Sequence, residues 1–161
     1  MVEMTVQRVG IDPRRNAVLI LADADGRRLL PIYIGFYEAQ SIAMAIGGED
    51  IGRPLTHDLL LSVIEAVGGR LREVHISSLV DRTFYAALCI SAGGRTIQID
   101  ARPSDAVALA VRTGARVLVA EDVLAQAQVV EQGEAEDETD QERFKDLLGQ
   151  IKLDDDQLEP E

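Results

Sequence analysis

The sequence predicts an α+β fold: a mixed, largely antiparallel sheet assembly built from two related β-hairpin–helix halves, with the helices packed on it. Strand-like stretches follow one another through short turns instead of alternating with helices, which disfavours a parallel α/β sheet. The stretch 30–43 aligns without gaps with 97–110, and in both an apolar strand leads into a helix with an acid in its first turn. The first two helical stretches end at glycine pairs, which accept the left-handed conformation that follows many helices.

The first half contains three predicted strands and one helix. The strands are expected at residues 4–11, 17–22 and 28–34. The sequence DADG at 23–26 predicts the turn of a hairpin between the last two strands. A helix expected at 37–46 ends at Gly47-Gly48.

The second half begins with a helix and continues as a second meander. RPLTHD at residues 53–58 leads into LLLSVIEAV, where apolar residues at helical spacing predict a helix that Gly68-Gly69 closes. Three further strands are expected at residues 71–79, 83–91 and 96–101, with AGG at 92–94 as the second hairpin turn. An apolar helix is then expected to start near Ser104, and a short strand is expected at 116–120.

The charge distribution divides the chain into three parts. The net charge of −12 lies entirely in residues 121–161, because 13 arginines balance 13 acidic residues in 1–120. We expect one domain at 1–125, an acidic linker at 126–140, and at 141–161 a short amphipathic helix with a mobile acidic tail. The helix is expected at 142–151, and it can dock either on the domain or on a protein partner.

The composition also indicates where the protein works. No secretion signal begins the sequence, and no apolar run approaches the length of a membrane span. Cys89 is the single cysteine, in an alternating strand-like segment, and a buried reduced thiol suits the cytoplasm. We therefore expect a cytoplasmic globular protein without a membrane contact.

Charged residues gather at the start of the third helix, in IDARPSDAVALAV at residues 99–111. Pro103 suits the first turn of a helix, and Asp105 lies where the helix dipole favours negative charge. Capping does not explain Asp100 and Arg102, which lie at a strand end. Two interpretations stay open: a structural network of caps and ion pairs, or a charged functional site.

A second Arg-Pro pair precedes the middle helix. Arg53 and Pro54 come before Thr56, a predicted N-cap, and then His57 and Asp58. If the halves are related by approximate symmetry, the two helix starts would share one cleft. Clustered carboxylates hold Mg²⁺ or Mn²⁺, arginines and helix N-termini hold phosphate, and histidine titrates near neutral pH. These are the groups that a phosphodiesterase needs.

The motifs LPIYIGFYEAQSIAMAI, RPLTHDLL, DRTFYAAL and IDARPSDAVALAVR resemble the bifunctional nuclease family, small bacterial and plant domains named for cleavage of both DNA and RNA. The resemblance covers about residues 4–124. It implies an α+β domain and a nuclease activity, which we expect to be metal-assisted and directed at single strands. The family's motif acids and basic residues fall on Glu38, Arg53, His57, Asp58, Asp100, Arg102 and Asp105.

We assign expected roles to these positions. Phosphate contacts are expected from Arg53 and Arg102, and proton transfer from His57. The expected catalytic acids are Asp58, Asp100 and Asp105. The same three acids, together with Glu38, are the expected ligands of a divalent cation, Mg²⁺ or Mn²⁺.

The electrostatics favour a second interpretation. Proteins that grip nucleic acid normally carry a basic patch, whereas residues 1–120 are neutral, and only 4% of the residues are aromatic. The alternative is a non-catalytic regulatory module that binds a protein partner or a small anionic ligand. In either case we expect a homo-oligomer, with a dimer favoured, paired through exposed apolar or edge-strand surface.

Overall fold

The fold is a single mixed sheet with helices packed on it, seen in a computed structural model that describes residues 1–127 and 130–131. Its strands are β1 (Val2–Ile11), β2 (Ala17–Asp23), β3 (Arg28–Ile34), β4 (Gly69–Val80), β5 (Thr83–Ala92), β6 (Arg95–Ala101), β7 (Arg116–Val119) and β8 (Val130–Glu131). They lie in the order β6-β5-β4-β7-β1-β2-β3-β8. Only the β4–β7 pair is parallel among the described strands, which confirms the predicted α+β class.

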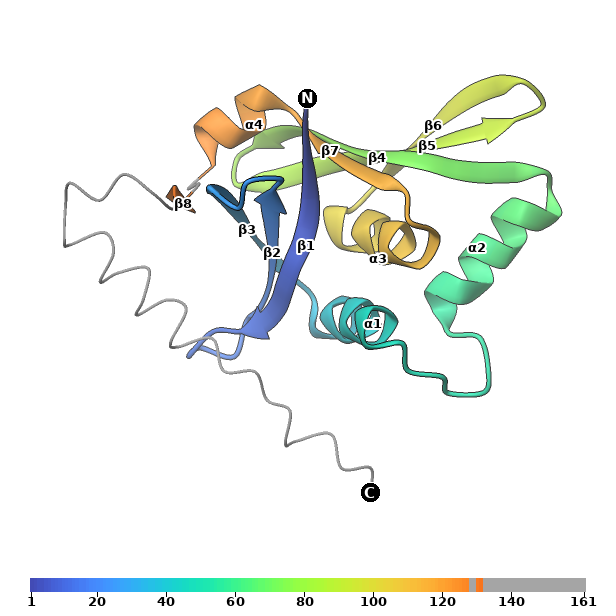
Figure 1. Cartoon of the computed structure of the whole chain (residues 1–161), viewed down its shortest axis with the longest axis horizontal. Coiled ribbons are helices and arrows are strands. Elements are labelled where there is room, and N and C mark those ends of the chain that lie inside the picture. Colours follow the sequence, from blue (N-terminus) through green and yellow to red (C-terminus); the bar gives the residue numbers. More distant parts are fainter. Residues whose placement is uncertain (128–129, 132–161) are drawn as a thin grey trace.

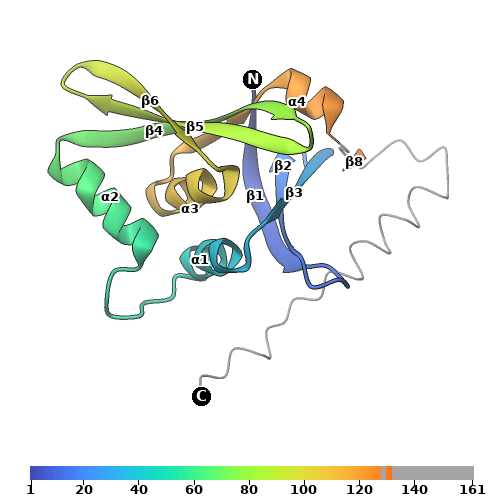
Figure 2. The same cartoon turned by 180° about the vertical axis from the view of Figure 1, so that it is seen from behind.

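The two predicted halves lie on either side of β7. Strands β1, β2 and β3 form one antiparallel meander that leads into α1 (Phe36–Gly47). Strands β4, β5 and β6 form the other, which leads into α3 (Pro103–Thr113). In Figures 1 and 2 the two meanders meet at an angle, and α1 and α3 lie side by side in that angle.

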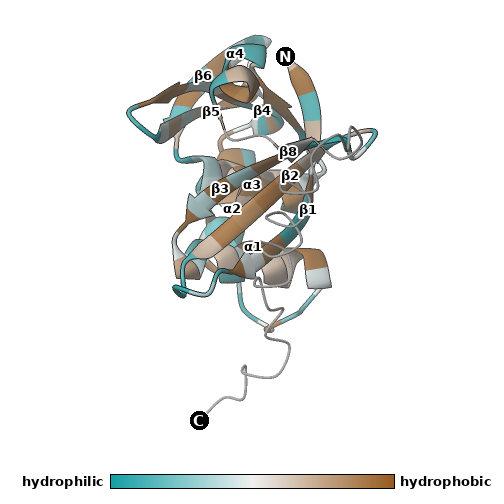
Figure 3. Ribbon diagram, turned by 90° about the vertical axis from the view of Figure 1, so that its left-hand side faces the viewer, coloured by the Kyte–Doolittle hydropathy of each residue, from teal (hydrophilic) through white to brown (hydrophobic). Residues whose placement is uncertain are grey.

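The strand sequences explain the core. Strand β2, AVLILAD, is apolar almost throughout and nearly all of it is buried, and Figure 3 shows it as a largely hydrophobic ribbon. A strand buried on both faces reads as a continuous apolar run. In the other meander, Val74 and Ile76 of β4 lie opposite Leu88 and Ala86 of β5, so these four side chains share the face that α3 covers.

Helix α3 approaches the sheet closely because its buried residues are small. Ala106, Ala108 and Ala110 have almost no exposed surface. Alanine brings little volume between a helix and the strands beneath it, which permits a dense contact. Helix α3 ends at Gly114, whose φ of 70° is the left-handed conformation that glycine adopts without strain.

The remaining helices are α2 (Thr56–Ala66) and α4 (Glu121–Gln126). The N-cap of α2 is Leu55, so the prediction of Thr56 as the N-cap is wrong. Asp58 supplies the cap instead, because its carboxylate accepts the backbone N–H of Leu55 at 2.8 Å. A side chain one turn into the helix can satisfy a donor that the N-cap residue leaves free.

Two short elements were not predicted. Helix α4 buries Val123 and Leu124, but six residues are too few for a helical period to be recognised. Strand β8 pairs with Arg28 and Leu29 of β3 and falls within the stretch predicted as an acidic linker. The helix expected at 142–151 lies outside the described residues. Cys89 is buried, as expected, and no described helix is long and apolar enough to cross a membrane.

Candidate functional site: a charged network between the helix starts

Helix α3 begins sharply after β6. Arg102 is the N-cap, in an extended backbone conformation, and its carbonyl accepts the first helical hydrogen bond from Ala106 at 3.0 Å. Pro103 occupies the first turn, where its missing N–H removes no helical bond. Asp105 follows in the same turn. The Arg-Pro-x-Asp sequence therefore places an arginine and a carboxylate together at the start of the helix.

Arg102 joins the two related helix starts. Its Nε donates to Asp105 Oδ2 at 2.8 Å, and its Nη2 donates to Glu38 Oε1 at 2.8 Å. Glu38 and Asp105 are the first-turn acids that the internal alignment of the two halves matches. The guanidinium therefore lies between equivalent positions of α1 and α3, on a side chain that is 64% exposed.

His57 connects Asp105 to the interior. Its Nε2 lies 3.0 Å from Asp105 Oδ1, and its Nδ1 lies 2.8 Å from Ser41 Oγ. An ionised carboxylate only accepts hydrogen bonds, so Nε2 carries a proton and donates it to Asp105. In the neutral ring, Nδ1 then accepts the hydroxyl proton of Ser41. Both ring nitrogens are thus engaged inside the protein.

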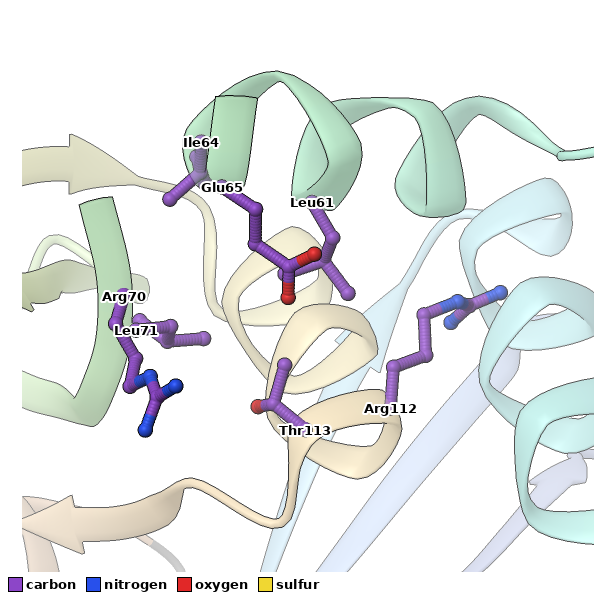
Figure 4. A pocket seen from close by; sticks show the side chains of 7 residues that line it. All are labelled: Leu61, Ile64, Glu65, Arg70, Leu71, Arg112 and Thr113. Atoms are coloured by element: carbon purple, nitrogen blue, oxygen red, sulfur yellow. The ribbon is translucent and has the colours of Figure 1, made fainter. Parts of the chain in front are cut away.

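Arg112 completes the chain of contacts at its inner end. Its Nε donates to Asp58 Oδ1 at 2.7 Å, and its Nη2 donates to Ser41 Oγ at 3.0 Å and to the Ser41 carbonyl at 3.2 Å. Its Nη1 donates to the carbonyl of Ala108 at 2.8 Å. The side chain is only 10% exposed. Figure 4 shows its guanidinium directed toward α1 and away from Arg70.

These contacts form one continuous set that links α1, α2 and α3. We call it the helix-start network. Its members are Glu38, Ser41, His57, Asp58, Arg102, Asp105 and Arg112.

The network favours the ionised forms of its acids. Burial raises the pKa of Asp105, but hydrogen bonds from Arg102 and His57 outweigh burial and bring that pKa below its usual value. The hydrogen bond from Arg112, followed by the one from the Leu55 N–H, lowers the pKa of Asp58. The hydrogen bond to Asp105 raises the pKa of Arg102.

The lowered pKa of Asp105 predicts a pH-dependent contribution to stability. A carboxylate whose pKa is lower in the folded state stabilises the protein above its unfolded pKa, about 3.9, and loses that contribution as the pH falls further. Asp105→Asn should therefore lower the free energy of unfolding by about 1–2 kcal/mol at neutral pH. Measured by urea unfolding, the difference in unfolding free energy between the variant and the wild type should shrink below about pH 4. Asp25→Asn, an exposed acid, is the control, and a gap that persists undiminished in acid would contradict the assignment.

The structure brings together five of the seven residues that the sequence singled out: Glu38, His57, Asp58, Arg102 and Asp105. Arg53 is exposed and makes no side-chain hydrogen bond or ion pair with the described residues. Ser41 and Arg112 were missed. Ser41 follows Gln40 in α1, and Arg112 lies in the last turn of α3 beside Thr113, so no sequence signal separates either residue from an exposed polar one.

Asp100 lies elsewhere. It is opposite Ala87 in the register of β5 and β6, one position away from the Ala86–Ala101 pair. Successive side chains of a strand point to opposite faces. Ala86 belongs to the core face that α3 covers, so Asp100 points to the other face, together with Cys89 and His75. The structure does not bring Asp100 into one cleft with His57.

The predicted cation ligands do not fit a shared ion in this arrangement. Glu38 and Asp105 are both bound by Arg102, Asp58 is bound by Arg112, and Asp100 lies on the other face of the sheet. The described residues contain no cluster of three or more His, Cys, Asp or Glu side chains able to hold a metal ion. Hard divalent cations need several oxygen ligands free to converge, which these ion pairs prevent.

Two hollows border the network. The first, of ≈ 320 Å³, lies between α2, α3 and β4 and is lined largely by Leu61, Ile64, Leu71 and the stem of Arg112 (Figure 4). The second, of ≈ 290 Å³, lies between the end of β3, the β4–β5 turn and the start of α3. We call the second one the α3 pocket. The first hollow meets the network at the buried Arg112, whereas the α3 pocket reaches the exposed Arg102. The α3 pocket is therefore the hollow through which a ligand can meet the network.

Comparison with known proteins agrees with the geometry. The sequence model described as "Bifunctional nuclease domain" matches residues 19–132. The uncharacterized protein Rv1829 of Mycobacterium tuberculosis is 42% identical over 160 residues, which cover 93% of this chain and 96% of that protein. Bifunctional nuclease 1 of Arabidopsis thaliana is 29% identical over 103 residues, or 62% of this chain and 31% of that protein. Bifunctional nuclease 2 of Oryza sativa subsp. japonica is 27% identical over 99 residues, or 60% of this chain and 30% of that protein.

The match therefore spans most of the mycobacterial relative but less than a third of each plant nuclease. The matched segment contains every member of the helix-start network. The family model covers well over half of the chain, from β2 to β8. The chain belongs to the bifunctional nuclease domain family.

Proposed function

We propose that the protein is a nuclease that cleaves phosphodiester bonds in single-stranded DNA and RNA. The observation that carries the proposal is the family match over residues 19–132, together with the names of the plant relatives. The helix-start network supports it, because Arg102 is held at the mouth of a hollow by two acids. An arginine fixed in this way can meet a phosphate with little loss of side-chain entropy.

Within this proposal the network residues take different roles. Arg102 contacts the phosphate. His57 and Asp105 form the pair that moves or holds a proton behind it, since histidine is the side chain that most readily exchanges a proton near neutral pH. Asp58 and Arg112 are structural, because Arg112 is buried and Asp58 accepts hydrogen bonds from it and from the Leu55 N–H. We assign no step to a divalent cation, and the requirement for one stays a prediction for the assay.

The test is cleavage of end-labelled single-stranded DNA and RNA by protein purified over two orthogonal columns. We expect a cleavage activity that co-elutes with the protein. The activity is measured in Mg²⁺, in Mn²⁺ and in EDTA. Contaminating nucleases are the main hazard, so a His57 variant purified in the same way is the control. Absence of cleavage under all three conditions would overturn the proposal.

One observation favours a second function, that of a non-catalytic module for a protein or a small anionic ligand. Glu38, Asp58 and Asp105 are already bound by arginines, which leaves no uncommitted carboxylate within the network. Structural ion networks resemble catalytic sites in their charges and pKa shifts. A folded protein that cleaves no single strand in Mg²⁺, Mn²⁺ or EDTA but binds inorganic phosphate would favour this alternative.

We also propose a homodimer paired through β6, which is one of the two edge strands of the described sheet. Ile97 and Ile99 are 47% and 46% exposed, although they lie opposite Ile90 and Leu88 of the core face. If two copies pair antiparallel about Gln98, Ile97 of each lies opposite Ile99 of the other and both edges gain hydrogen bonds.

Light scattering should then give twice the chain mass of 17.5 kDa. Ile99→Lys should yield a monomer, because a lysine on an edge strand opposes pairing. Ile51→Lys, at an exposed isoleucine outside any strand, is the matched control and should stay dimeric. A wild-type protein that is monomeric at working concentration would contradict this arrangement.

A further inference from the structure

The aromatic residues are few but concentrated. Among the described residues, every aromatic side chain comes from one of two short segments, 33–37 and 84–85. Four of them are exposed: Tyr33, Phe36, Tyr37 and Tyr85, at 63%, 54%, 81% and 45%. Aromatic rings usually bury most of their surface in a core. Rings left in solvent therefore need another explanation.

Both aromatic segments border the α3 pocket. Tyr33 and Gly35 line the pocket from the first segment, and Phe84 lines it from the second. Phe36 and Tyr37 follow directly in the first turn of α1, with their rings 6.0 Å apart in an edge-on arrangement. Figure 2 shows the β4–β5 turn beside β3, and β6 leading into α3. The fold thus brings Tyr33 and Phe84, from distant parts of the chain, to one hollow, and we call these two rings its aromatic border.

The same pocket contains groups suited to phosphate. Arg82, in the β4–β5 turn, lines it and makes no hydrogen bond or ion pair with the described residues, and its φ of 64° fixes it in a tight turn. Arg102 uses its Nε and Nη2 on acids, which leaves Nη1 uncommitted. Ser104 is only 5% exposed, lines the pocket, and has no hydrogen-bond partner among the described residues. It lies in the first turn of α3, where backbone N–H groups and the helix dipole attract anions.

We propose that the α3 pocket and its aromatic border bind single-stranded nucleic acid, with a backbone phosphate at Arg82, Arg102 and Ser104 and a base stacked on Tyr33. This inference rests on the proposed nuclease function for its choice of ligand, and it names the surface that the strand occupies. Proteins bind single strands by pairing cationic side chains with aromatic rings on which bases stack. In a duplex the base faces are already stacked and cannot reach such rings. The overall neutrality of residues 1–120 is then no obstacle, because the charge and the rings are local.

The test is binding of a fluorescein-labelled, mixed-sequence DNA single strand to the full chain, followed by anisotropy in EDTA. Tyr33→Ala should weaken binding by roughly 5- to 100-fold, the range for loss of one base–aromatic stack, whereas Tyr33→Phe keeps the ring and should bind as the wild type. Arg82→Ala should weaken binding and reduce the slope of log affinity against log salt by about 0.7, the value for one phosphate on a single strand.

Arg27→Ala is the matched control for charge. It removes an exposed arginine that precedes β3, roughly 20 Å from Tyr33 at about 3.4 Å per strand residue. It should leave the affinity and the salt slope close to those of the wild type. The same sequence as a duplex should bind more weakly than the single strand. Circular dichroism and thermal unfolding verify that Tyr33→Ala and Arg82→Ala are folded.

The outcomes separate this inference from the nuclease proposal. If the protein cleaves DNA but Tyr33→Ala and Arg82→Ala bind like the wild type, the strand binds elsewhere and the nuclease function stands. If binding falls in both variants but no cleavage is seen, the surface is correct and the nuclease function is overturned. A wild type that does not bind single strands overturns the inference.

Discussion

Replacing Arg112 by methionine is expected to lower the free energy of unfolding by about 3 kcal/mol, the largest stability effect of any single substitution in the network. The side chain is 10% exposed and donates to Asp58, to Ser41 and to the carbonyl of Ala108. Removing one partner from a buried ion pair typically costs about 3–5 kcal/mol, since it leaves buried groups without partners. Asp58 is 42% exposed and regains water, so we take the lower end of that range.

Urea or thermal unfolding measures this effect, with a drop in melting temperature of roughly 6–12 °C. Arg116→Met is the matched control, because Arg116 also pairs with an acid, Glu73, but is 56% exposed. It should change the free energy by at most about 1 kcal/mol, as exposed pairs do. Arg112→Lys keeps the charge but lacks the planar guanidinium, so its loss of unfolding free energy should lie between those of Arg116→Met and Arg112→Met. An Arg112→Met protein within about 0.5 kcal/mol of the wild type would show that the network does not hold the helices together.

Much of the fold follows from local sequence signals. The hairpin turn at 23–26, the glycines that end α1, and Pro103 at the start of α3 act within a few residues, so they are readable from the chain. The aligned halves also predicted that the first-turn acids of α1 and α3 are equivalent. What local patterns do not contain is which side chain reaches which partner across the fold.

The site shows the same division. The acids and arginines at the helix starts were recognisable because a helix N-terminus imposes residue preferences. Arg112 was missed, since its role depends on Asp58 and Ser41, which are distant in sequence. The position of Asp100 depends on strand register, and a shift by one residue moves a side chain to the other face. The aromatic border was also hidden, because 4% aromatic content says nothing about where the rings gather.

His57→Ala is expected to lower the rate of DNA and RNA cleavage per folded molecule about 100-fold or more, the usual contribution of a general acid or base. His57 is the only histidine of the helix-start network, and it is bonded to Asp105, which holds Arg102 at the α3 pocket. Asp100→Asn is the matched control. It also changes a charged residue of the same motif, yet Asp100 lies on the other face of the sheet. Asp100→Asn should leave the cleavage rate within about twofold of the wild-type rate, since the Asp100 carboxylate contacts no member of the network.

His57→Gln decides between proton transfer and simple positioning. The glutamine amide can still donate an N–H to Asp105, but it cannot gain or lose a proton near neutral pH. If His57 only holds Asp105 in place, His57→Gln should retain most of the activity that His57→Ala loses. If it transfers a proton, both variants should be similarly impaired while binding of single-stranded DNA in EDTA is preserved. We expect the second result. Retained activity in His57→Ala, or a loss in Asp100→Asn as large as in His57→Ala, would place the chemistry away from the helix-start network.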